Sequence, residues 1–348
     1  MISDIRLQHF RSYADAFFEL DPAVNIIAGP NASGKTNLLE AVLVAAHGSS
    51  FRAKDAELMQ FGAPWTRIDA TTPDGVRTIK LQTQPSFSKS YEISGQKLTR
   101  LHSSKMLPVV LFEPNHLLLM SGSPELRRSF LDDLIEQSET GFGAVRRHYK
   151  RVLSQRNALL KRNPSDLREQ LFVWNVRLSE LGGQIAKKRA ELVHRFNEQT
   201  PELYIHLAGR DNHIILEYYS RFPIDQYESQ LLHKLESSMD LDVLRGFTAY
   251  GPHRDDLRVT IDSHLMQESA SRGETRTLVL ALKIMELQLI EEARGVRPLL
   301  LLDDVFSELD AKRRAALTEY AGLYQTLITT TDADVVMQYF QGSNQIVL

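Results

Sequence analysis

One eight-residue segment constrains this chain more than any other, because it fills every fixed position of the phosphate-binding pattern G-x-x-x-x-G-K-[ST]. The pattern needs glycine where the backbone approaches phosphate oxygens, a lysine for the outer phosphates and a hydroxyl for Mg2+. An apolar run at 24–28 predicts a buried strand before the segment, and residues 37–43 predict a helix after it. We therefore expect an α/β fold that binds a nucleoside triphosphate, rather than an ordinary glycine-rich turn, through Gly29, Pro30, Asn31, Ala32, Ser33, Gly34, Lys35 and Thr36.

Two adjacent aspartates, Asp303 and Asp304, end a second apolar run at 298–302. Open α/β sheets place their ligand groups at the carboxyl ends of parallel strands. Asp303 is therefore a candidate Mg2+ ligand together with Thr36. Asp304 is a candidate base for an attacking water, and Lys35 is the other catalytic candidate. A simple strand-ending turn is the structural alternative for the two aspartates.

The composition narrows the class of protein. The chain has 348 residues, of which 43% are hydrophobic, enough for one large core or two smaller ones. It has no cysteine, which excludes disulfides, thiolate catalysis and cysteine zinc sites. No apolar stretch is long enough to cross a membrane, and we expect a soluble cytoplasmic protein. The formal net charge is -3, so any affinity for DNA must come from a local basic surface.

The chain is expected to form two lobes. The phosphate loop and the aspartate strand lie near opposite ends of the chain, so residues 1–122 and 201–348 would together form an ATPase lobe. Short polar and apolar alternation at 65–93 predicts antiparallel hairpins within that lobe. A helical period dominates 123–200, which is expected to form a helical lobe with 15 Lys and Arg against 10 Asp and Glu.

A basic helix is expected within the helical lobe. Residues 141–162 contain seven basic residues and no acidic one. A helix with this composition is either a DNA-binding surface or an ordinary solvated face. The DNA-binding candidates are Arg146, Arg147, Lys150, Arg151, Arg156, Lys161 and Arg162.

Beyond residue 201, strands are expected at 202–206 and 213–219, and a long apolar-rich helix is expected from 275 to 292. The segment directly before that helix has two local readings. A serine followed three residues later by glutamate is a capping box, whereas an exposed helix start with glycine leaves N–H groups free for an anion. We call this segment the signature; it consists of Ser271, Arg272, Gly273 and Glu274.

Six stretches carry a resemblance to one known family, and they span nearly the whole chain: 7–13, 34–41, 50–52, 122–132, 251–257 and 302–310. They resemble the RecF family, which lies within the ABC-type ATPases related to SMC and Rad50. The resemblance implies an ABC-type P-loop ATPase head with antiparallel β additions and a helical second lobe.

The resemblance also implies a mechanism. ATP would bind between two copies of the chain, with the phosphate loop of one copy facing the signature of the other, and the closed dimer would engage DNA. Asp310 would lie in the loop at the dimer seam, and Arg11 and Ser12 would lie near the nucleotide. Slow ATP hydrolysis would serve as the release step. RecO- and RecR-type partners would help to load recombinase onto gapped DNA during repair and replication.

The chain departs from the family in two places. Arg272 and Glu274 stand where the family usually has glutamines, and Asn115 and His116 stand where it usually has an acidic pair after a proline. The turn with His253 and Arg254 either forms a salt-bridged loop or contacts phosphate. Other classes compete with the main interpretation: a small-molecule kinase, an SMC-like tether, and an ATPase subunit of a defence or nuclease system. The helical lobe is too short for the sustained heptads of a tether.

Overall fold

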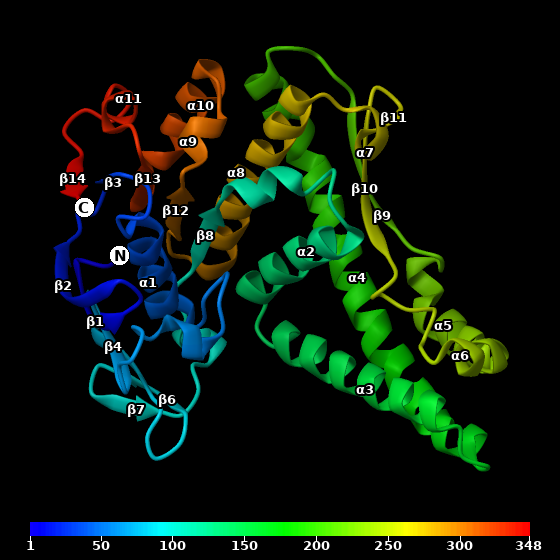
Figure 1. Ribbon diagram of the computed structural model, residues 1–348. Helices are drawn as coiled ribbons and strands as arrows, with labels where there is room; N and C mark the ends of the chain where they lie inside the picture. The colour runs from blue at the N-terminus through cyan, green and yellow to red at the C-terminus, as the bar shows by residue number, and fades with distance from the viewer. The chain divides into compact units, whose positions relative to one another are not determined.

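The computed structural model describes all of residues 1–348 and divides into two units (Figure 1). The nucleotide unit comprises Met1–Leu117 and Glu286–Leu348, and the helical unit comprises Leu118–Met285. The first boundary lies close to the expected one, but residues 201–285 group with the helical unit instead of the ATPase lobe. Two buried arginines explain the difference, because Arg127 pairs with Asp256 and Arg189 donates to the carbonyl oxygen of Pro252.

The core of the nucleotide unit is a parallel sheet with the strand order β14-β3-β13-β12-β8. Three of these strands, β3, β12 and β13, are buried along most or all of their length, as expected of continuous apolar runs in a parallel sheet. The strands are β3 Val24–Ala28, β8 Val109–Phe112, β12 Leu299–Asp303, β13 Thr326–Thr330 and β14 Asn344–Val347. The helices are α1 Lys35–His47, α9 Val305–Glu308, α10 Ala311–Ala321 and α11 Ala333–Met337, with 3-10 turns at Asp55–Leu58, Ser103–Lys105 and Pro114–Leu118.

A second sheet of the nucleotide unit is antiparallel, with the strand order β2-β1-β4-β5-β6-β7. It confirms the predicted hairpins. Ile68 and Ala70 of β4 and Ile79 and Leu81 of β5 alternate with more exposed residues, so one face of the sheet packs on a core shared with α1. The strands are β1 Asp4–Phe10, β2 Tyr13–Glu19, β4 Trp65–Thr72, β5 Gly75–Gln82, β6 Ser88–Ile93 and β7 Gln96–Leu98.

Three long helices begin the helical unit: α2 Pro124–Ser138, α3 Phe142–Arg162 and α4 Leu167–Ala208. The strand predicted at 202–206 is wrong, because α4 continues through Pro201 to Ala208. Thr200, Tyr204 and Leu207 are the buried residues there, and their spacing is that of a helix. The apparent alternation of polar and apolar residues at Glu202–His206 is too short to distinguish the two-residue period of a strand from the 3.6-residue period of a helix.

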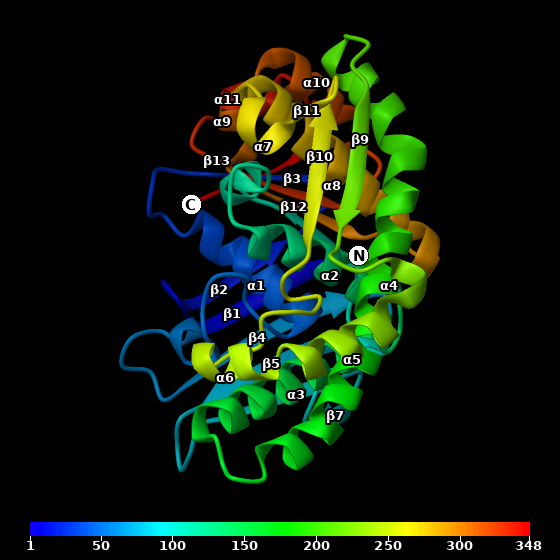
Figure 2. The same cartoon turned by 90° about the vertical axis from the view of Figure 1, so that its right-hand side faces the viewer.

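The rest of the helical unit is a three-stranded antiparallel sheet with short helices, and Figure 2 shows β9 and β10 running alongside α4. The predicted strand near 213–219 and the long helix near 275–292 are confirmed. The strands are β9 Ile214–Tyr219, β10 Asp256–Ile261 and β11 His264–Leu265. The helices are α5 Tyr227–Ser237, α6 Met239–Arg245, α7 Met266–Ser269 and α8 Arg272–Arg294, with a 3-10 turn at Ile224–Gln226. The helix α8 crosses the boundary between the units, which falls between Met285 and Glu286. None of the helices has the length and apolar content that crossing a membrane requires.

Candidate nucleotide-binding site

The phosphate loop follows β3 and leads into α1, as predicted, and its glycines are required by the geometry. Gly34 has a φ of 110°, and a Cβ there would lie 2.8 Å from the Tyr13 hydroxyl oxygen. A Cβ on Gly29 would lie 2.7 Å from the carbonyl oxygen of Leu348. Burial raises the pKa of Tyr13 to about 12, so its hydroxyl stays protonated and donates to the carbonyl oxygen of Gly34 at 3.1 Å. The loop is thus held in shape by contacts that leave no room for side chains.

Lys35 lies across the loop. Its Nζ donates to the carbonyl oxygens of Gly29 and Pro30, both at 2.8 Å, and the residue is 8% exposed. These acceptors are neutral, so an incoming phosphate would offer the ammonium group a stronger partner. The hydroxyl oxygen of Ser33 is buried and has no hydrogen-bond partner. An unpaired polar group inside a phosphate loop is consistent with a ligand that completes it.

Thr36 and Asp303 meet, although they come from opposite ends of the chain. The Thr36 hydroxyl donates to Oδ1 of Asp303 at 2.9 Å, and the hydroxyl of Thr329, at the end of β13, donates to the same oxygen at 2.7 Å. Asp303 is 9% exposed. Hydroxyl and carboxylate oxygens at this spacing are suitable ligands for Mg2+. Thr329 was not predicted, although its place at the end of a parallel strand was the available signal.

Asp304 has a left-handed backbone, with a φ of 53°. Its N–H donates to the Thr329 hydroxyl at 2.9 Å, which fixes the backbone, while its Oδ1 is buried without a partner. Burial raises the pKa of Asp304, and the neighbouring charge of Asp303 adds to the increase. A fixed carboxylate with an unused acceptor atom fits a group that orients water beside a triphosphate.

A buried carboxylate, Glu40 of α1, holds two arginines at the start of that helix. Arg11 donates to both Glu40 oxygens at 2.9 and 2.8 Å, and Arg52 donates to one at 3.0 Å. Burial alone would raise the pKa of Glu40, but hydrogen bonds from both guanidinium groups and from a serine hydroxyl outweigh it and lower the pKa. Asn37 links the group to the loop, since it donates to Ser12 and accepts from Arg52. Arg11 and Ser12 thus lie at the phosphate-loop helix, and Glu40 and Arg52 are residues that the sequence did not single out.

The signature segment forms the capping box that the sequence allowed. The backbone N–H and the hydroxyl of Ser271 donate to Oε2 of Glu274 at 2.8 and 2.7 Å, and the Glu274 N–H donates back to the Ser271 oxygen at 3.2 Å. Arg272 is exposed, and Gly273 is partly buried. Asp310 caps α10, because its carboxylate accepts from the N–H of Arg313 at 3.0 Å.

The basic helix divides into two groups. The prediction that Arg156 contacts DNA is wrong, because this side chain is fully buried and donates to Asp242 and Asn175, both at 2.8 Å. Arg146 is also unsuited, since its side chain is 16% exposed and pairs with carboxylates of α2 that include Asp133. The remaining five candidates are exposed: Arg147, Lys150, Arg151, Lys161 and Arg162.

His253 and Asp255 of this turn belong to a buried network of the helical unit, whereas Arg254 is exposed. Nε2 of His253 lies 3.1 Å from the carbonyl oxygen of Thr248, which can only accept, so Nδ1 accepts from the Tyr149 hydroxyl at 2.6 Å. Burial lowers the pKa of His253 to about 4, and this histidine is neutral at pH 7. Asp255 accepts from two tyrosine hydroxyls, both at 2.7 Å. For His253 the structure supports the interpretation as a structural loop, although hydrogen bonds to neutral partners replace the expected salt bridges.

These observations define the class of protein as the head of an ABC-type P-loop ATPase. The parallel sheet carries a phosphate loop after β3 and an aspartate pair at the end of β12, and an antiparallel sheet is added to it. The chain belongs to the RecF family. The family model described as RecF/RecN/SMC N terminal domain matches residues 1–345. A DNA replication and repair protein RecF from Synechococcus sp. (strain JA-3-3Ab) is 36% identical, and the match covers 94% of this chain and 90% of that protein.

Two solved structures of the recombination mediator protein RecF in the RecFOR pathway share the fold. The RecF-ATPrS structure has a TM-score of 0.89 and 27% identity, covering 100% of this chain and 96% of that one. The RecF-ATP structure has a TM-score of 0.84 and 28% identity, covering 96% of this chain and 92% of that one. The expected fold class, an ABC-type head with antiparallel additions and a second, helix-rich unit, is thus confirmed.

Proposed function

We propose that this protein is an ATP-dependent DNA-binding protein of recombinational repair and replication, in which ATP joins two copies into a clamp on DNA. The observation that carries the proposal is the pairing of Thr36 with Asp303 under a phosphate loop whose Ser33 hydroxyl has no partner. The relatives' names support the biological setting, since they are DNA replication and repair proteins and one solved relative is RecF-ATP.

Within one copy, the loop N–H groups and Lys35 would bind the triphosphate, with Lys35 exchanging the carbonyl oxygens of Gly29 and Pro30 for phosphate oxygens. Thr36 and Asp303 would hold Mg2+, which neutralises charge on the outer phosphates. Asp304 would orient the water and accept its proton when ATP is slowly hydrolysed. These roles make hydrolysis the release step of the clamp.

The second wall of the site would come from the other copy. Ser271 directly precedes α8 and Gly273 lies in its first turn, where the positive end of the helix dipole favours an anion. For the Ser271 hydroxyl to donate to a phosphate, its hydrogen bond to Glu274 must break. Asp310, which is exposed at the start of α10, would lie at the seam between the copies.

The clamp would act on DNA at gaps and help to load recombinase, with partners of the RecO and RecR type. The exposed cations of α3 are the proposed contacts with the phosphate backbone. Four of them, Lys150, Arg151, Lys161 and Arg162, make no ion pair in the structure, so binding DNA would not cost them an existing partner. Such contacts give sequence-independent affinity that falls with salt.

Light scattering on an Asp304→Asn variant tests the proposal, because this variant should bind ATP and not turn it over. Its mass should double with ATP and Mg2+ and return to that of the monomer after ATP is removed. Duplex or gapped DNA should raise the dimer fraction at limiting ATP, because DNA would bind only the closed form. A monomer at every ATP concentration would refute the clamp. Turnover with a small phosphate acceptor and no change of mass would favour the kinase alternative.

A further inference from the structure

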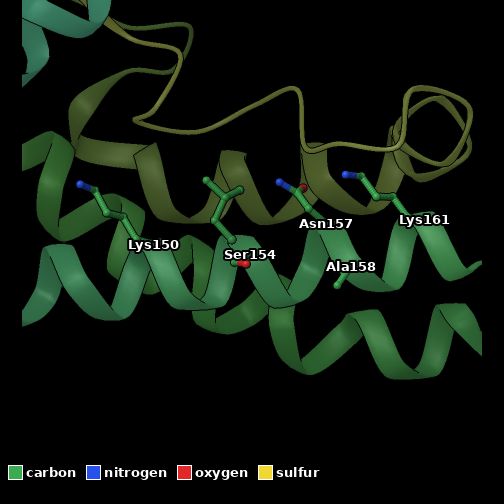
Figure 3. A pocket seen from close by; sticks show the side chains of 6 residues that line it. Lys150, Ser154, Asn157, Ala158 and Lys161 are labelled. Atoms are coloured by element: carbon green, nitrogen blue, oxygen red, sulfur yellow. The ribbon is translucent and has the colours of Figure 1, made fainter. Parts of the chain in front are cut away.

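A shallow groove of about 440 Å3 runs along one side of α3 in the helical unit (Figure 3). Figure 3 shows Lys150, Asn157 and Lys161 extending from α3 toward the chain that borders the groove. At 1.5 Å of rise per residue, the two lysines lie about 16 Å apart along the helix. The groove contains no acidic residue, and its lining is Lys150, Leu153, Ser154, Asn157, Ala158 and Lys161.

The loop that follows α6 is fixed against this groove. Oδ1 of Asn157 accepts from the N–H and the hydroxyl of Thr248 at 2.8 and 2.7 Å. The buried Arg156 donates to the same Thr248 hydroxyl at 2.7 Å. A Cβ on Gly246 would lie 3.6 Å from Cγ of Lys161, so the loop touches the lysine stem. The groove is therefore preformed, and a ligand would find its cations already positioned.

The loop also carries an aromatic residue between its two contacts with the groove, Gly246 at Lys161 and Thr248 at Asn157. Phe247 follows Gly246 directly and is 41% exposed. The guanidinium of Arg254 lies 5.1 Å from the centre of the Phe247 ring. Exposing such a ring costs free energy in water, and a flat ligand that covers it would recover that energy. Neither lysine makes an ion pair, so the groove offers unpaired positive charge, and the loop that borders it carries a ring that is partly exposed although Arg254 lies over it.

We infer that this groove binds one strand of nucleic acid, with phosphates at Lys150 and Lys161 and an unpaired base stacked on Phe247. Single-strand sites combine a basic track along the backbone with aromatic rings under the bases. In a duplex the faces of the bases are covered by their neighbours, so Phe247 would have nothing to stack on. The inference rests on the proposed DNA-binding function and deepens it, since it gives the clamp a place for the unpaired strand of a gap.

Fluorescence anisotropy with the full-length protein and ATP tests the site, using a 20-nucleotide oligothymidylate and a 20-base-pair blunt duplex. Phe247→Ala should weaken binding of the single strand by at least about fivefold, the lower end expected for losing one stacked base, and leave duplex binding within twofold. Lys150→Gln with Lys161→Gln should lower the salt slope for the single strand by about 1.4, since each phosphate contact contributes about 0.7.

Matched controls separate these effects from general damage. Phe172→Ala removes another exposed phenylalanine of the helical unit, and Lys97→Gln with Lys187→Gln removes two other exposed lysines. Both controls should bind the oligothymidylate like the unchanged protein. Unchanged single-strand binding by Phe247→Ala, or equal losses of affinity for strand and duplex, would overturn the inference. In either outcome, ATP-dependent duplex binding by the unchanged protein would leave the proposed function intact, whereas its absence would refute that function instead.

Discussion

Replacing Glu40 by glutamine tests whether the carboxylate organises the start of the phosphate-loop helix. Glu40 has no exposed side-chain surface, whereas the side chains of Arg11 and Arg52 are 22% and 37% exposed. Breaking a fully buried ion pair costs about 3–5 kcal/mol, but these guanidinium groups can regain water after the substitution. We therefore expect Glu40→Gln to lower the free energy of unfolding by about 2–3 kcal/mol, since the amide retains the shape and part of the hydrogen bonding.

The two tryptophans allow this loss to be measured in the right unit. Trp65 lies in the nucleotide unit and Trp174 in the helical unit. In a Trp174→Phe background, urea unfolding followed by Trp65 fluorescence reports the nucleotide unit alone. Glu19→Gln, which changes an exposed carboxylate of β2, is the control and should stay within about 0.5 kcal/mol. A Glu40→Gln protein as stable as this control would refute the reasoning.

Three further predictions concern other parts of the molecule. Arg156→Met should lower the free energy of unfolding of the helical unit by about 3–5 kcal/mol, measured by Trp174 fluorescence in urea, because it leaves the buried Asp242 without its partner. Adding Asp242→Leu should restore most of the lost stability, and a double variant with no restored stability would contradict the pairing. Burial holds the folded-state pKa of His253 at about 4, below the unfolded value, so protonation on acidification favours unfolding. The free energy of unfolding of the helical unit should therefore fall by about 2–3 kcal/mol between pH 7 and 4.5. His253→Asn should remove that part of the pH dependence, and an unchanged slope of stability against pH would contradict the prediction. The start of α8 would face a phosphate, and Glu274→Gln removes a negative charge from it. The dissociation constant of the ATP-dependent dimer should therefore fall by about 3–10-fold in sedimentation experiments, and a weaker dimer would count against the proposed role of the signature.

The nucleotide site was predictable because its signals are local. The phosphate loop is defined by consecutive residues, and Asp303 stands where parallel sheets place ligand groups, so the contact with Thr36 followed from two short patterns and one rule of topology. Glu40 was not predictable in the same way. Its partners, Arg11 and Arg52, come from two different loops, and only the tertiary fold brings them to one carboxylate.

The basic helix shows where a charge count fails. Tyr149, Val152, Arg156 and Leu160 are all buried, and their spacing places them on one face of α3. The structure places Arg156 on this buried face, whereas the count of basic residues had assigned it to DNA. Its buried partner Asp242 lies far along the chain, which is why the ion pair could not be read from the helix itself.

Mixing two inactive variants tests the central claim most directly, since a shared site needs residues from two copies. Lys35→Ala removes the phosphate-loop cation, and Ser271→Arg blocks the signature. Each variant alone should hydrolyse no ATP. In an equal mixture, about half of the dimers pair the two variants, and each of these has one intact composite site out of two. Activity should therefore return to about a quarter of the unchanged protein's rate for a symmetric dimer. A mixture with no activity beyond that of its parts, or a fully active Ser271→Arg protein, would contradict the account.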